Sequence, residues 1–160
     1  MALKPDRDYN ETTDITNFWT TVAAEKGGMA CVVTQGTGAS IGINLADEAN
    51  VVGYLATINI NSVPKGILLQ TVAAAMSATR DFPNFENGEI RPSDKCTLVT
   101  QGWVVTDMIH PSVTPAAGDP AYLAVSGFVS STSGALTRRV GRFETAKDAN
   151  GFARVSIDIN

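Results

Sequence analysis

The side chains that could carry out acid–base chemistry in this sequence centre on its only histidine, His110. A nucleophile–histidine–acid triad needs a serine on one side of the imidazole and a carboxylate on the other. Asp107 is three positions away in what reads as the end of a strand, where the two side chains would point to opposite faces. We therefore expect His110, which precedes Pro111 in a turn, to be a surface residue rather than a catalytic one.

A glycine-rich segment, 36–40, invites a second chemical interpretation, the binding of phosphate groups. A P-loop needs a lysine that reaches the terminal phosphates, and no lysine follows here. A dinucleotide-binding turn needs a glycine at position 41, but the next glycine is Gly42. We expect a surface loop and no bound nucleotide.

Metal binding has no support in the residue types. A structural zinc site needs four Cys or His ligands, whereas this chain has one histidine and two distant cysteines, Cys31 and Cys96. The carboxylates are scattered and do not follow the pattern of a calcium loop. We expect reduced, buried thiols with a small apolar role, no metal and no other cofactor.

A basic cluster is formed by Arg138, Arg139 and Arg142. In a strand, Arg138 and Arg142 share one face and Arg139 takes the other. Charged side chains on an edge strand can simply block unwanted pairing with other sheets. They can equally form salt bridges with acidic residues of a partner subunit, and the sequence leaves both interpretations open.

The composition narrows the class of protein. The chain has 160 residues and a mass of 16.8 kDa, which is enough for one domain with one core. Its net charge of -4 and its pI of about 4.9 argue against nucleic-acid binding. No apolar run approaches the ~20 residues of a membrane span, and the N-terminus lacks the apolar core of a signal peptide. We expect a protein that is made in a cytoplasm and then meets a partner.

The N-terminal part of the chain differs in character from the rest. Residues 1–13, which include Tyr9, have little to bury and favour an extended arm that is dispensable for folding but needed for attachment. Residues 15–23 carry apolar side chains at the spacing of one helix face. The stripe includes Phe18 and Trp19, which would pack in the core or, as we expect for Trp19, contact a partner.

Short strands separated by Gly, Pro, Asn and Asp dominate the rest of the chain. The loop 80–92 carries Phe82 and Phe85, which either fold back onto the domain or dock on a partner. The last strand alternates apolar and polar side chains most clearly. The predicted strands are 29–34, 51–61, 63–69, 95–106, 121–125, 128–131, 140–145 and 152–159.

These elements predict an all-β fold, a small β-barrel or sandwich of roughly seven to nine short strands. At most two short helices are expected, at 15–23 and 71–78. We divide the chain into an N-terminal arm with a short helix, 1–28, and a barrel-like domain, 29–160.

Six phrases follow one another in the second half of the chain. They are Val63–Leu69 (VPKGILL), Lys95–Thr106 (KCTLVTQGWVVT), Ala117–Leu123 (AGDPAYL), Ser126–Val129 (SGFV), Val140–Phe143 (VGRF) and Asp148–Gly151 (DANG). In this order the chain resembles the small capsid decoration, or cement, proteins of tailed bacteriophages. The resemblance covers about 63–159 and is least in 80–92.

This resemblance implies a β-barrel or β-tulip domain, no enzymatic activity, no cofactor, and a place on the outside of an icosahedral phage head. It implies two partners, the major capsid protein and further copies of the chain, most often as a trimer, and neither nucleic acid nor membrane. The alternatives are a phage tail or fibre component and a small-barrel enzyme that would use Asp107 and His110. The candidate partner contacts are Tyr9, Phe18, Trp19, Phe82, Phe85, Arg138 and Arg139.

Overall fold

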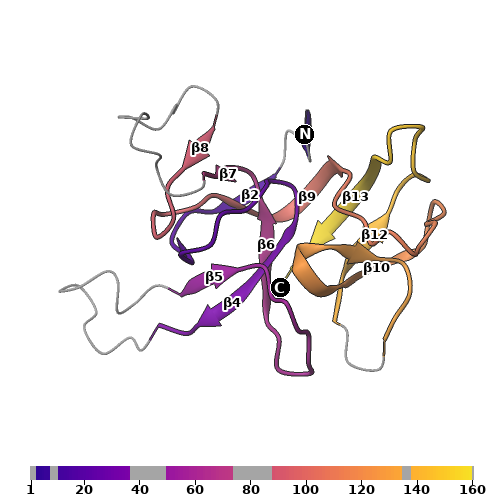
Figure 1. Ribbon diagram of the computed structural model, residues 1–160. Helices are drawn as coiled ribbons and strands as arrows, with labels where there is room; N and C mark the ends of the chain where they lie inside the picture. The colour runs from indigo at the N-terminus through magenta and orange to yellow at the C-terminus, as the bar shows by residue number, and fades with distance from the viewer. Residues whose placement is uncertain (1–2, 8–10, 37–49, 74–87, 135–137, 160) are drawn as a thin grey trace.

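The computed structural model describes residues 3–7, 11–36, 50–73, 88–134 and 138–159. It is nearly all β (Figure 1), so the predicted fold class is confirmed. The helical structure of these residues is a 3-10 turn, η2 (Val125–Gly127). The strands are β1 (Leu3–Arg7), β2 (Thr12–Asp14), β3 (Phe18–Trp19), β4 (Met29–Thr34), β5 (Val51–Gly53), β6 (Pro64–Leu68), β7 (Thr71–Val72), β8 (Glu89–Ile90), β9 (Leu98–Thr106), β10 (Pro120–Leu123), β11 (Val129–Ser130), β12 (Arg139–Phe143) and β13 (Ala153–Asp158).

Eleven of these strands belong to one sheet, in the order β11-β10-β12-β13-β9-β6-β4-β5-β3, with β1 and β2 attached to β9. The other two strands, β7 and β8, pair in parallel as a small separate sheet. Of the barrel and the sandwich that the sequence predicted as alternatives, a closed barrel is not formed by the described residues, because no pairing among them joins the end strands β11 and β3. Each end strand has only two residues.

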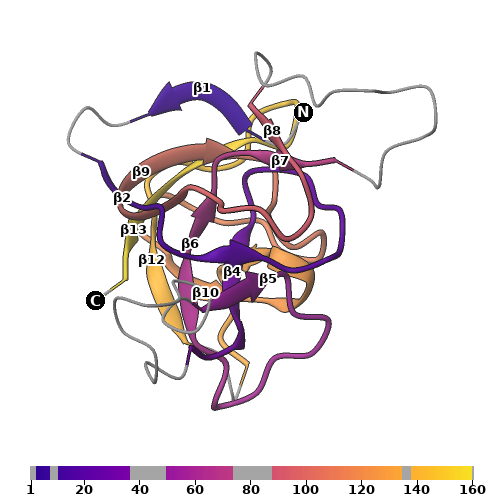
Figure 2. The same cartoon turned by 90° about the vertical axis from the view of Figure 1, so that its left-hand side faces the viewer.

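The N-terminal segment lies along β9 of its own chain (Figure 2). β1 and β2 both pair antiparallel with β9, from Leu3 opposite Thr106 to Asp14 opposite Leu98. β9 also pairs with β13 and with β6, so it has partners along both edges. The arm predicted to have little to bury therefore satisfies backbone hydrogen bonds within the domain.

The helix predicted at 15–23 is wrong. The segment contains β3, which pairs in parallel with β5, and irregular turns on either side. The carboxylate of Asp14 accepts hydrogen bonds from the backbone N–H and the hydroxyl of Thr16, a local arrangement that competes with helix formation. The apolar spacing does not mark one buried face either, because Ile15 and Val22 are 61% and 65% exposed.

Several predicted strands are confirmed. β4 occupies 29–34 as predicted, β6 begins at Pro64, and β9 is one continuous strand. The two predicted hairpins, β10 with β11 and β12 with β13, are present. The alternation of β13 is also confirmed, with Ala153, Val155 and Ile157 buried and Arg154, Ser156 and Asp158 outside.

Two other expectations need correction. The strand predicted at 51–61 ends at Gly53, and the chain then makes turns, one of them closed by the N–H of Ser62 and the carbonyl of Asn59. The helical turns predicted at 71–78 begin instead with the strand β7, and the remainder lies outside the described residues.

The core has two parts on the two faces of the central strands. Successive residues of β4, Met29 and Ala30, belong to the larger and the smaller cluster, and Ile67 and Leu68 of β6 divide in the same way. Because neighbouring side chains of a strand point to opposite faces, these strands are covered on both sides. This double burial explains the continuous apolar run at the start of β4.

Candidate interaction surfaces

Trp19 lies inside the smaller core cluster, with 1% of its surface exposed. Its indole Nε1 donates a hydrogen bond to the carbonyl oxygen of Val22 at 2.8 Å. Its ring meets the ring of Tyr54 edge to face, with centroids 5.1 Å apart. Both the ring and the polar atom are satisfied within the chain, so we correct the expectation that Trp19 contacts a partner.

Tyr54 joins three segments around Trp19. Its hydroxyl donates to the carbonyl oxygen of Glu25 at 2.7 Å and accepts from the N–H of Gly28 at 3.0 Å. Gly127 lies against the ring at a φ of +79°, and a Cβ there would come within 2.6 Å of the ring. Burial raises the pKa of the Tyr54 hydroxyl above its ordinary value, so it stays a hydrogen-bond donor. We call Trp19, Tyr54, Gly28 and Gly127 the aromatic hub.

Phe18 is only half-buried, although it is the neighbour of Trp19 in β3. Successive side chains of a strand point to opposite faces, so the two rings do not share an environment. The Nζ of Lys95 lies 5.8 Å from the Phe18 ring centroid, within the range of a cation–π interaction. β3 is also an end strand of the sheet, and Phe18 therefore stays a candidate contact residue.

The two predicted arginines, Arg138 and Arg139, line a surface groove of about 490 Å³ at the start of β12. Both side chains are exposed. The other lining residues come from the end of β2, from β6, from β9 and from the C-terminal end of the chain, and they are Asp14, Val63, Pro64, Lys65, Thr100, Asp158 and Ile159. We call this depression the arginine groove.

Asp14 is a carboxylate of the arginine groove that is held by its own chain. Burial alone would raise its pKa, but hydrogen bonds from Thr16 and Asn17 and the nearby charge of Lys65 outweigh that effect. The pKa of Asp14 therefore lies below its usual value, and the group is ionised at neutral pH. Its oxygens are already engaged within the chain.

A second hollow, of about 440 Å³, shares Arg139 with the groove and runs along β12 and β13. It is lined in part by Gly141 and Ser156, and a Cβ on Gly141 would collide with the carbonyl oxygen of Ser156. Arg142 forms a salt bridge of 3.2 Å with Glu144 at its rim. Of the three clustered arginines, Arg142 is thus already paired.

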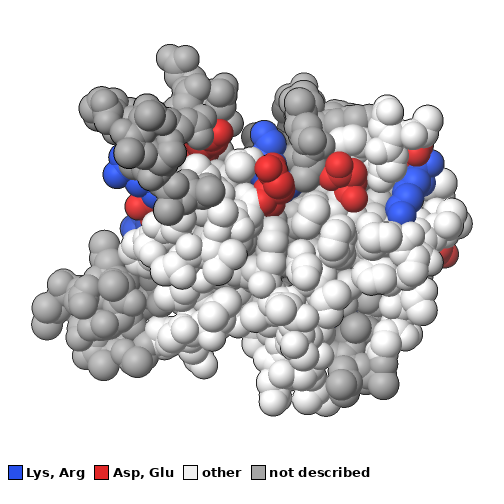
Figure 3. Space-filling model, in the orientation of Figure 1, with Lys and Arg blue, Asp and Glu red and all other residues white. Residues whose placement is uncertain are grey.

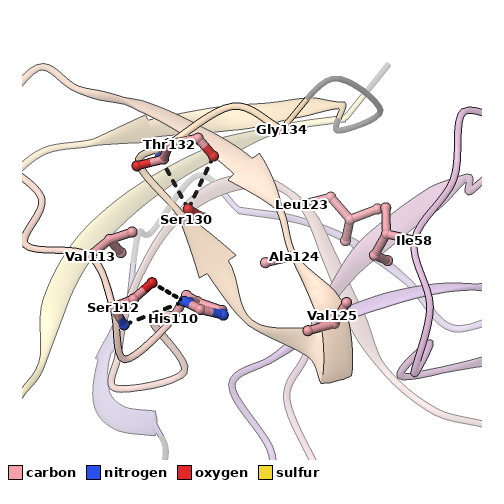
Figure 4. Close-up of a pocket in the computed structure, with 10 residues that line it drawn as sticks. All are labelled: Ile58, His110, Ser112, Val113, Leu123, Ala124, Val125, Ser130, Thr132 and Gly134. Atoms are coloured by element: carbon pink, nitrogen blue, oxygen red, sulfur yellow. Dashed lines mark hydrogen bonds between the residues drawn. The ribbon is translucent and has the colours of Figure 1, made fainter.

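A third hollow, of about 490 Å³, has no Lys, Arg, Asp or Glu in its lining (Figure 4). His110 and Ser112 stand on one side, with Nδ1 and Oγ 2.7 Å apart. Ile58, Leu123 and Val125 lie across from them in Figure 4. The hollow is therefore suited to an apolar side chain rather than to an ion.

The sequence around this third hollow is uncharged over long stretches. Segments 49–64, 108–118 and 120–137 contain no Lys, Arg, Asp or Glu. Figure 3 shows one side of the molecule on which the charged side chains of the described residues gather in the upper part. The area below, where Figure 1 places β4 and β10, is free of them.

The residues considered for catalysis do not form a triad. Asp107 and His110 share no hydrogen bond in the described structure, and the imidazole contacts Ser112 instead. The spacing Gly-X-Ser-X-Gly, typical of serine hydrolases, occurs at 38–42, a motif that our interpretation of this loop passed over and that lies outside the described residues. In the part of the chain that the structure covers, no three His, Cys, Asp or Glu side chains are placed to hold a metal ion.

Both cysteines are buried, as predicted, and each has a free thiol in this structure. Cys31 belongs to the larger core cluster and Cys96 to the smaller one. Burial raises the pKa of each thiol to about 12, so neither is a reactive thiolate at neutral pH. Among the helices of the described residues, none has the length and apolarity to cross a membrane.

The remaining predicted contact residues, Tyr9, Phe82 and Phe85, lie outside the described residues. What the sequence did not indicate is that Lys65 and Thr100 lie beside the two arginines. They come from β6 and β9, far away along the chain. Only the pairing of strands brings them together, and no local pattern could have identified them.

Comparison with known families gives one informative match. Residues 6–158 match the family described as structural cement protein (E217 gp24/Pam3 gp6), a phage family. The match runs from the N-terminal arm to the last strand, so it covers nearly the whole chain. No curated protein matches the sequence. The family description implies a structural role in the virion rather than an enzymatic one.

Proposed function

The chain belongs to the family of phage structural cement proteins, and from that membership we propose that it binds the outside of an assembled icosahedral head and stabilises it. Its main partner is the major capsid protein of the same virion. It is made in the cytoplasm of the bacterial host and acts without a cofactor, a metal, nucleic acid, a membrane or an enzymatic activity.

The observation that carries this proposal is the extent of the family match, which includes β2 to β13 and part of the arm. A protein that binds only the assembled lattice stabilises it by its differential affinity for that state. Weak contacts at several lattice points add up when copies also bind one another. A small all-β protein that exposes one candidate contact surface at Phe18 and another at Arg138 and Arg139 suits this role.

We further propose that the protein self-associates, as a trimer, and that Phe18, Arg138 and Arg139 contact partners. Phe18 and both arginines are at least partly exposed, as such contacts require. Tyr9, Phe82 and Phe85 stay proposed contact residues on the basis of their residue types alone.

Sedimentation tests the proposal directly. Heads from phage that lack this protein are incubated with the purified chain in their expanded and unexpanded forms, and bound protein is measured after pelleting. We expect saturable binding to expanded heads at hundreds of copies per head. Binding only to tails, at a few copies per virion, would support a tail component and contradict the proposal.

A further inference from the structure

We infer that the arginine groove is a contact site for a second copy of this chain, where Arg138, Arg139 and Lys65 hold carboxylates of the neighbouring copy. The inference deepens the self-association within the proposed function and rests on it. It adds where on the chain the contact lies, which charged groups form it, and that the two copies use different surfaces.

The first step is the state of the two arginines. Arg138 and Arg139 are adjacent and exposed at the start of β12. No ion pair joins either of them to a carboxylate of the described residues, and the guanidinium of Arg139 donates only to the carbonyl oxygen of Gly141, at 3.2 Å. Guanidinium groups prefer bidentate carboxylates, so these two donors are open to a partner.

The second step is the shape of the surroundings. The groove of about 490 Å³ is walled by Val63 and Pro64 and by Ile159, which give apolar flanks to the charged side chains. Val63 is 40% exposed. A protein segment laid in such a groove would bury apolar surface as well as pair its charges. An isolated small ion would use only the charges.

The third step is charge complementarity within one molecule. The chain has 16 acidic and 12 basic residues. Three of the basic residues line the groove, and so do two of the acidic ones, Asp14 and Asp158. The carboxylate of Asp14 already accepts hydrogen bonds within its own chain. This leaves 14 acidic against nine basic residues elsewhere, so the rest of a second copy is a net acidic partner for the groove.

The fourth step concerns symmetry. A contact between a basic groove and a different, acidic surface is heterologous, because the two copies use different patches. Heterologous contacts close into rings when the rotation between copies allows it, as in a trimer. Exposed ion pairs are screened by salt, so the assembly should be salt-sensitive.

The first experiment measures association of the full-length protein by light scattering and sedimentation at about 50 mM and about 500 mM salt. We expect self-association at low salt that weakens at high salt. Arg138→Glu with Arg139→Glu should raise the dissociation constant by about tenfold or more. The matched control, Lys26→Glu with Arg91→Glu, makes the same change of charge, and Arg91 follows β8, which Figures 1 and 2 both place away from β12. It should associate like the wild type.

A second experiment identifies the occupant. Nitrogen-15-labelled and unlabelled copies are mixed and treated with a carbodiimide, which links an amine to a carboxylate in direct contact. Mass spectrometry should find Lys65 of one copy joined to an Asp or Glu of another, and Lys65→Arg should abolish that product. Cross-links to the major capsid protein alone, when the same reaction is run on decorated heads, would overturn the inference in favour of a capsid segment.

Further outcomes separate this inference from the proposed function. A protein that stays monomeric at low salt but binds expanded heads overturns the inference and leaves the proposed function intact. Association that is insensitive to the arginine substitutions also overturns it. A protein that assembles through the groove but does not bind heads supports the inference and contradicts the proposed function.

Discussion

Two regions, the aromatic hub and the arginine groove, contain residues that were candidates for partner contacts, and the structure buries the one, Trp19, but exposes the others, Arg138 and Arg139. In the hub, Trp19 is 1% exposed and its indole nitrogen is satisfied within the chain. In the groove, Arg138 and Arg139 are exposed and have no carboxylate partner among the described residues. The hub should therefore govern folding, whereas the groove should govern association.

The difference shows how a residue type acts through its surroundings. Aromatic side chains are enriched both in cores and in interface hot spots, so Trp19 alone indicated neither. The role of Trp19 is decided by the chain itself, which supplies the edge-on ring of Tyr54 and a carbonyl acceptor for the indole N–H. Arginine is exposed in most proteins, so exposure alone does not single out Arg138 and Arg139 either; what does is that both line one groove with guanidinium donors open to a carboxylate.

The largest expected effect is that of Trp19→Ala, because it empties a fully buried site. We expect the free energy of unfolding to fall by about 3–5 kcal/mol, measured by denaturant titration at a salt concentration that keeps the protein monomeric. Trp103→Ala is the matched control, since Trp103 is half-buried on β9 under Arg154, with 4.9 Å between guanidinium and ring centroid. Equal losses for both variants would contradict the claim that the hub governs folding.

The next effect tests the glycine under Tyr54. Gly127→Ala places a Cβ against the Tyr54 ring at a positive φ, and we expect a loss of about 1–3 kcal/mol. Gly151→Ala has a similar φ of +86° but open space around it, so it should show only the cost of the backbone conformation. The difference between the two melting temperatures measures the contact with Tyr54, and no difference would remove Gly127 from the hub.

A smaller effect concerns Asp14, which holds the turn between β2 and β3. Asp14→Ala removes the hydrogen bonds to Thr16 and Asn17 and should cost about 1 kcal/mol at neutral pH. Because the pKa of Asp14 is lowered in the folded state, this stability is present above pH ~3.8 and is lost as the pH falls through the folded pKa. Unfolding of both proteins from pH 7 down to pH 2.5 should show the curves converging in acid. A constant gap would mean that the ionised form is not what stabilises the turn.

The smallest effect on folding is expected for the groove. Arg138→Glu with Arg139→Glu should change the free energy of unfolding of the monomer by less than ~0.5 kcal/mol, since neither arginine is paired within the described chain. The check is denaturant titration at high salt, where association does not contribute. A loss comparable to that of Trp19→Ala would make the arginines structural and end the contrast between the two regions.

The sequence was informative where burial leaves a simple pattern along a strand, either on one face, as in β13, or on both faces, as at the start of β4. The alternation of β13 and the continuous apolar run of β4 gave both strands directly. At 15–23 the same kind of counting failed, because a hydrogen-bonded turn at Asp14 and a partner strand, β5, override a helical spacing in a Thr-rich segment. Local propensity does not contain such long-range pairing.

The candidate surfaces show the same limit. The two arginines were visible as neighbours in the sequence, and they do lie together in a groove. The rest of the groove comes from β2, β6, β9 and the C-terminal end, which meet only because β9 has partners on both edges. The open path of the sheet likewise depends on which strands end it, and the predicted strands carried no information on that order.

The central claim, that this chain stabilises an assembled head, is tested most directly by heating heads that lack it. The measured quantity is the temperature at which packaged DNA becomes accessible to a fluorescent dye, with and without added protein. We predict that the wild type raises this temperature and that the Arg138→Glu/Arg139→Glu variant raises it less. The Lys26→Glu/Arg91→Glu control should match the wild type. Saturated heads that release DNA at the same temperature as bare heads would contradict the account.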